Sequence, residues 1–129
     1  MRLRLVLAMA LVLALGPVGL SNESVSAHEN QTQAYHDGVC YWWGQQQWIG
    51  FYGQEGTAKG VTSLWDGSCT KVRVKLRYRT SQSCTLVVET RNPPAHAVTR
   101  NGYHTDYSDA DVLLGGIWYG FRVDHPGSC

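Results

Sequence analysis

One segment of the chain alternates strictly between charged and apolar residues. Within residues 71–79 the apolar positions are Val72, Val74, Leu76 and Tyr78, and the cationic positions are Lys71, Arg73, Lys75, Arg77 and Arg79. A period of two places the apolar side chains on one face of a strand and the cations on the other. The segment therefore predicts a half-buried antiparallel strand, and no amphipathic helix or internal repeat competes with it.

The first 27 residues have the pattern of a signal peptide. Arg2 and Arg4 precede an apolar run, Leu5 to Leu15, that Gly16 and Pro17 end. This run of about 11 residues is too short for a bilayer core that needs about 20, although an anchoring helix is the alternative. The small residue Ala27 marks the expected cut. We expect an exported, extracellular monomer with no membrane contact after processing, a flexible arm at residues 28–38 and one β domain at residues 39–129.

Removing 27 residues from 129 leaves 102, and the charge balance changes. Two arginines and one glutamate leave with the leader, so nine Lys and Arg face nine Asp and Glu. A neutral chain has no overall field that would attract nucleic acid or an anionic membrane. All fourteen aromatic residues remain, and this composition favours strands over helices.

The four cysteines all lie in the expected mature chain, at Cys40, Cys69, Cys84 and Cys129. An even number in a small exported domain predicts two disulfides. The alternative is metal ligation, but no cysteine pair has the spacing of a zinc knuckle. We therefore predict no metal site and no cofactor. Three disulfide connectivities remain open.

Further segments rich in strand formers are separated by turn signals. Strands are expected at residues 40–52, 84–90, 95–100, 103–107 and 112–123, with a loop from Gly53 to Ser63, turns at 80–83 and 108–111, and a bulge or bend at Gly115-Gly116. Within 84–90, Cys84, Leu86 and Val88 are expected to point inward, and Asn101-Gly102 predicts a tight hairpin turn. The fold class is predicted to be all-β, a small antiparallel β-sandwich or open barrel stapled by two disulfides.

The segment from Gly67 to Tyr103 has a cysteine, a long alternating strand ending in Tyr78, a polar turn, Cys84 and a later Gly-Tyr pair. It resembles the tendamistat family of secreted actinobacterial α-amylase inhibitors over about a third of the chain. The resemblance implies a six-stranded sandwich, pairing of Cys40 with Cys69 and of Cys84 with Cys129, and enzyme inhibition. That family's Trp-Arg-Tyr triplet has no counterpart between Cys40 and Cys69, so no inhibitory site is carried over.

Aromatic and amide side chains share one face of the segment 40–52, namely Trp42, Gln46, Trp48 and Tyr52. Flat rings beside amides can stack on sugars and hydrogen bond to them, so these residues are predicted to bind a ligand. Core packing is the alternative for each. Because aromatics lie on both faces, at least one of Trp42, Trp48 and Tyr52 is expected near the surface.

The cations Lys71, Arg73, Lys75, Arg77 and Arg79 form a candidate surface for an anionic partner. Neighbours on the face lie about 6.6 to 6.8 Å apart, inside a Debye length of about 8 Å. A polyanion could bind there. The alternative is a solvated face that Glu89, expected on the same side, partly neutralises.

A third candidate is a catalytic group that contains the residue types of small ribonucleases. Its members are Glu89, Arg91, His96, Arg100 and His104. Their mutual geometry is not set by the sequence. Asp106, Asp109 and Asp111 lack the spacing of an EF-hand loop, and Asn30 is a sequon only in a glycosylating host. We therefore expect a binding or inhibitor-like module acting on an extracellular hydrolase or surface polysaccharide, with a small secreted hydrolase as the alternative.

Overall fold

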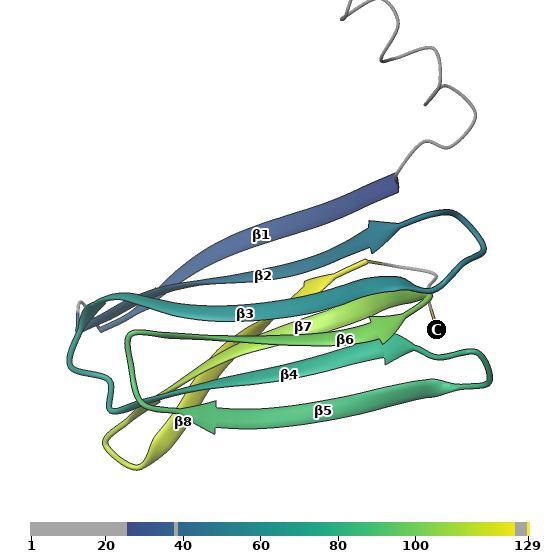
Figure 1. The fold of residues 1–129 in the computed structure, drawn as a ribbon. Helices are drawn as coiled ribbons and strands as arrows, with labels where there is room; N and C mark the ends of the chain where they lie inside the picture. The colour runs from purple at the N-terminus through teal and green to yellow at the C-terminus, as the bar shows by residue number, and fades with distance from the viewer. Residues whose placement is uncertain (1–25, 38, 126–128) are drawn as a thin grey trace, which may run out of the picture.

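A computed structural model describes residues 26–37, 39–125 and 129. Within these residues the chain forms two stacked antiparallel sheets of four strands each (Figure 1). The strands are β1 (Ser26–His36), β2 (Cys40–Gly50), β3 (Gly56–Gly67), β4 (Lys71–Arg79), β5 (Cys84–Arg91), β6 (Ala95–Gly102), β7 (His104–Leu114) and β8 (Ile117–Asp124). Sheet A has the order β1-β2-β3-β6, and sheet B has the order β5-β4-β7-β8. No helix in the described part has the length and apolar character needed to cross a membrane.

The all-β sandwich predicted from the sequence is confirmed. The alternating segment is β4, whose residues Val72, Val74 and Leu76 are fully buried. The disulfides Cys40–Cys69 and Cys84–Cys129 also confirm the pairing that the family resemblance implied. The strand count differs, because two four-stranded sheets replace the six strands that the resemblance implied.

The prediction of a flexible arm at residues 28–38 is wrong. Residues 26–36 form β1, which pairs with β2 over its whole length, from Ser26 opposite Gly50 to His36 opposite Cys40. This edge strand has few apolar residues and so lacks the alternation of apolar and polar residues that predicts a strand. Its sequence therefore resembles that of a loop. Its outer face is held by amides, since the Glu29 carboxylate accepts hydrogen bonds from the side chains of Gln31, Gln45 and Gln47.

Three other local expectations are wrong. Most of the segment 53–63 belongs to β3 rather than to a loop, and residues 108–111 lie inside β7 rather than in a turn. Asn101-Gly102 does not close a hairpin, because β6 pairs with β3 in sheet A while β7 pairs with β4 in sheet B. The chain instead crosses between the sheets at Tyr103, whose N–H donates to the Arg79 carbonyl at 2.8 Å.

Strand β5 presents the opposite face from the one predicted. Leu86 and Val88 point outward and are each half exposed, whereas Val87 packs against the core. The register explains the reversal, because Val87 lies opposite the buried Leu76 and Glu89 lies opposite the buried Val74. Gly115 and Gly116, expected to form a bulge or bend, form the β7–β8 turn with positive φ angles of 58° and 79°.

Two tryptophans of β2 fill the two halves of the core. Trp42 packs with the Cys40–Cys69 disulfide and Val112, and Trp48 packs with Leu76 and Val98. Each indole N–H donates to a backbone carbonyl, at 3.1 Å from Trp42 to Ala110 and at 3.0 Å from Trp48 to Gly102. These bonds satisfy the one polar atom of each buried ring.

Gly44 lies between the two tryptophans on the inner face of β2. A Cβ atom there would lie 2.4 Å from the Cβ of Ala110 and 3.1 Å from the Phe121 ring of sheet B. The spacing between the sheets at this point therefore requires glycine.

We predict that Gly44→Ala lowers the free energy of unfolding by about 1 to 3 kcal/mol, because the added methyl overpacks the core. Urea unfolding measures the change. The control is Gly44→Ala combined with Ala110→Gly, which moves the methyl from one sheet to the other. The double variant should lose less stability than the sum of the two single changes, and simple additivity would contradict the steric explanation.

Candidate functional site

Three histidines from distant parts of the chain meet at one end of the sandwich. His28 lies near the start of β1, His104 is the first residue of β7, and His125 directly follows β8. One ring nitrogen from each lies within 4.8 Å of the other two. All three side chains are half buried. We call this set the histidine cluster.

Contacts between the two sheets and within sheet B hold the histidine cluster in place. The Asn30 side-chain amide of β1 donates to the Asp124 carbonyl of β8 at 2.6 Å, and the His125 N–H donates to the Asp106 carbonyl at 2.8 Å. The Trp48 ring stacks on His104 with centroids 5.0 Å apart and an interplanar angle of 20°. The histidine cluster therefore packs against the buried core, through Trp48, rather than against a loop.

A hydrogen bond at His104 and the lowered pKa of His125 both bear on metal ligation. His104 Nδ1 lies 2.8 Å from the Thr105 carbonyl oxygen, which can only accept, so Nδ1 carries the proton. In the tautomer that this bond selects, the lone pair lies on Nε2. Burial, with the nearby His104 and His28, lowers the pKa of His125, which favours the neutral form that can bind a metal ion.

The histidine cluster lines a half-open pocket of about 530 Å³. Its other walls are formed by Trp48, Tyr52, Gly53, Arg79, Thr80, Ser81 and Tyr103. Nitrogen ligands at 2.0 to 2.1 Å from a tetrahedral ion lie about 3.3 Å apart. Separations of up to 4.8 Å therefore need a modest tilt of the rings to close on an ion.

Sequence reasoning missed the histidine cluster and predicted no metal site. Its members are 76 and 21 positions apart, so no local spacing marks them. The available signal was the expected cut after Ala27, which puts His28 at the first position of the mature chain. His104 was assigned instead to the catalytic group with Glu89, which the structure places elsewhere.

The aromatic platform predicted from Trp42, Gln46, Trp48 and Tyr52 does not exist as an exposed surface. Trp42, Gln46 and Trp48 are 3%, 0% and 1% exposed, whereas Tyr52, past the end of β2, is 94% exposed. The period-two grouping was right, but that face of β2 points into the core. Tyr52 and the edge of Trp48 instead line the pocket of the histidine cluster.

Exposed aromatics lie on the outer face of sheet A. Tyr35 and Tyr41 stack with centroids 5.4 Å apart and an interplanar angle of 15°. Trp65 beside them is 67% exposed. A shallow hollow of about 740 Å³ adjoins the pair and is lined by Gln31, Thr32, Gln33, Trp43, Ser63, Leu64 and Trp65. We call this region the aromatic surface.

The basic face of β4 is neutralised by sheet B itself. Arg73 contacts Asp111 at 2.9 Å, Lys75 contacts the same carboxylate at 3.9 Å, and Arg77 contacts Asp106 at 3.2 Å. Lys71 hydrogen bonds to Asn92, and Arg79 lines the pocket of the histidine cluster. The acidic partners come from β7, so the expectation that Glu89 neutralises this face is wrong.

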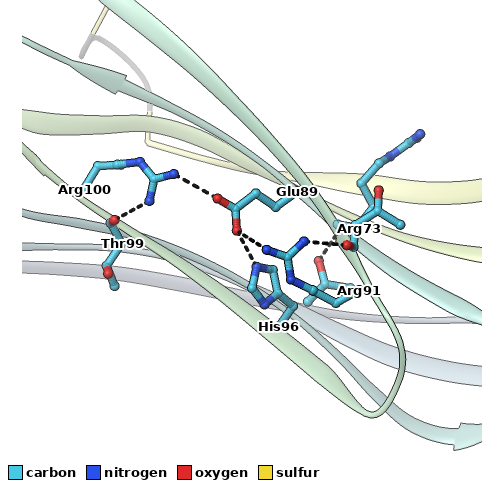
Figure 2. Close-up of polar contacts among 8 residues, drawn as sticks. Arg73, Glu89, Arg91, His96, Thr99 and Arg100 are labelled. Carbon is cyan, nitrogen blue, oxygen red and sulfur yellow. Dashed lines mark hydrogen bonds and ion pairs between the residues drawn. The ribbon is translucent and has the colours of Figure 1, made fainter.

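Glu89 instead points toward His96 and Arg100, which belong to β6 (Figure 2). Its carboxylate lies 2.7 Å from His96 Nε2, 2.9 Å from Arg100 and 3.5 Å from Arg91. The hydrogen bonds from His96 and Arg100 lower the pKa of Glu89. The structure thus brings together four members of the predicted catalytic group and places His104 elsewhere.

The chemistry of this Glu89 cluster favours a structural role. A general base works best with a pKa near the operating pH, and the pKa of Glu89 moves in the other direction. The acid and base of a nuclease must also flank the phosphate, whereas His96 and Glu89 bond directly to each other. The cluster therefore joins β5 to β6 across the edge of the sandwich.

Comparison of the chain with family models, with curated proteins and with solved structures finds no match. The resemblance to α-amylase inhibitors therefore stays a prediction. Functional inference must come from the residues themselves.

We predict that Glu89→Gln removes a pH-dependent part of the stability. Because the folded pKa of Glu89 lies below its ordinary value of 4.5, the stabilisation is complete above that pH and is lost as the pH falls through the lowered pKa. In urea unfolding the variant should be less stable than the parent at pH 7, and the two should converge toward pH 3. Glu55→Gln, in an exposed loop, is the control. An equal gap at both pH values would contradict the prediction.

Proposed function

We propose that this protein is an exported binding protein for a divalent transition-metal ion held by His28, His104 and His125. The convergence of three ring nitrogens within 4.8 Å carries the proposal. Imidazole suits zinc, copper and nickel, whereas calcium and magnesium prefer oxygen ligands. The two disulfides support an exported protein, because such bonds persist in oxidising compartments.

The surroundings of the histidine cluster support a nitrogen-only site. Among the described residues that line its pocket, none is a carboxylate. Trp48 stacks against His104, and such an apolar wall limits access of water from one side. Arg79 and Tyr103 also line the pocket, so an anion or a water molecule beside them can complete the coordination.

We predict that the mature chain binds Zn(II) at one site and that His104→Ala weakens this binding. The loss should exceed the roughly 10- to 100-fold that removal of a second-shell partner costs, because a direct ligand disappears. Competition with a chromophoric chelator measures the affinity. His96→Ala, which removes a histidine outside the cluster, should leave the affinity unchanged. Equal losses in both variants, or no binding by the parent, would count against the proposal.

A second candidate function is favoured by the aromatic surface. We propose that an extracellular polysaccharide stacks on Tyr35, Tyr41 and Trp65. The parallel stacking and high exposure of these rings, beside the amides Gln31 and Gln33, support it. Sugar rings present flat apolar faces to aromatic side chains and hydroxyl groups to amides.

We predict that soluble chitin or starch oligosaccharides shift the tryptophan fluorescence and that Trp65→Ala weakens this binding about tenfold, as the loss of one stacked ring would. Trp118→Ala, on the outer face of sheet B, is the matched control and should bind as the parent does. Absence of any sugar-dependent shift, or an equal effect of both variants, would sink this second function.

A further inference from the structure

His28 occupies a position that the expected processing step would change. The predicted cut follows Ala27, so His28 would become the first residue of the mature chain. In the structure Ala27 is exposed and pairs with Ile49, immediately before the histidine that reaches the pocket. The peptide bond expected to be cut therefore adjoins one of the three proposed metal ligands.

Cleavage of that bond changes the chemistry of the His28 nitrogen. Before cleavage this nitrogen belongs to a planar amide, whose lone pair is delocalised into the carbonyl group. Hydrolysis of the Ala27–His28 bond consumes one water molecule, leaves a carboxylate on Ala27 and turns the His28 nitrogen into a primary amine. This amine can donate its lone pair to a metal once it loses its proton. An amine and the Nδ1 atom of the same histidine close a six-membered chelate ring on one ion.

We propose that removal of the leader completes the metal centre, with the α-amine of His28 joining the imidazoles of His28, His104 and His125 and favouring Cu(II). The inference rests on the proposed metal-binding function and deepens it by naming the ion and the step that creates the full ligand set. The precursor offers three nitrogen ligands, and the processed chain offers four.

The structure keeps the new amine at the pocket after cleavage. The ladder between β1 and β2 continues from His28 opposite Trp48 to His36 opposite Cys40, so loss of Ser26 and Ala27 leaves most of the pairing intact. The Asn30 bond to the Asp124 carbonyl at 2.6 Å fixes β1 two residues downstream. The His28 ring already contacts those of His104 and His125, with centroids 5.0 and 4.8 Å away.

The ligand set favours copper over zinc. Four nitrogen donors suit the tetragonal geometry of Cu(II), and the chelate holds amine and imidazole near a right angle. Zn(II) prefers a tetrahedral arrangement, which three imidazoles and a water molecule already provide. The amine should therefore add more to Cu(II) affinity than to Zn(II) affinity.

The test compares two mature chains that differ only at the His28 nitrogen. A synthetic peptide thioester of residues 28–39, with a free or an acetylated amine, can be ligated to a chain that begins at Cys40, and the product is then oxidised and refolded. Circular dichroism checks that both forms fold alike. Cu(II) and Zn(II) are titrated into each by chelator competition, and the visible absorption of bound Cu(II) is recorded.

We expect acetylation to weaken Cu(II) binding by about 100-fold or more, to change Zn(II) binding by less than about tenfold and to shift the Cu(II) absorption to longer wavelength, because one nitrogen ligand is lost. Equal Cu(II) affinity in the two forms would overturn the inference. An exported protein whose mass shows a first residue other than His28 would overturn it as well.

Variants separate this inference from the proposed function. In the free-amine chain, His104→Ala and His125→Ala should each weaken Cu(II) binding, and His96→Ala should not. If the free-amine and acetylated chains bind Cu(II) equally but both need His104, the metal-binding function stands and the role of the amine is refuted. If neither His104 nor His125 matters, the three-histidine site itself is refuted.

Discussion

The burial of Trp42 and Trp48 on one face of β2 is the constraint on which the rest of the sandwich depends. The Trp42 indole N–H donates a hydrogen bond to the Ala110 carbonyl of sheet B, and the Trp48 ring stacks on His104 of the histidine cluster. With Gly44 between them, the two sheets approach so closely that a Cβ atom at this position would clash with Ala110. Because one face of β2 is committed to the core, Tyr41 and its neighbours on the other face must point to solvent.

The two edges of the sandwich are closed by different chemistry. On one edge β5 meets β6 through the Glu89 carboxylate. One of its oxygens contacts His96, and the other accepts a hydrogen bond from Arg100. On the other edge β1 meets β8 through the stacking of His36 on Tyr119, 3.7 Å between centroids, and through Asn30. The pocket lined by His28, His104 and His125 lies at one end of this second edge.

Much of the fold was predictable because its signals are local. The alternation in β4 and the even number of cysteines predicted a stapled β-sandwich. Strand β1 and the inward face of β5 were missed. An edge strand need not show a hydrophobic period, and Glu89 faces inward because it pairs with His96 and Arg100 rather than because it is apolar. The candidate site was missed for a related reason. His28, His104 and His125 become neighbours only through the order in which the strands pair, and no spacing in the sequence records that order.

Neither disulfide cross-links β1 to the rest of the domain, so only the main chain joins it covalently to β2. Cys40–Cys69 joins β2 to the segment after β3, and Cys84–Cys129 joins β5 to the last residue. Strand β1 is held by its ladder with β2 and by side-chain contacts with sheet B. An ion bound by His28, His104 and His125 would act as a third cross-link, a reversible one, between residues far apart in the sequence. The occupancy of the site would then set how firmly the N-terminal strand is docked.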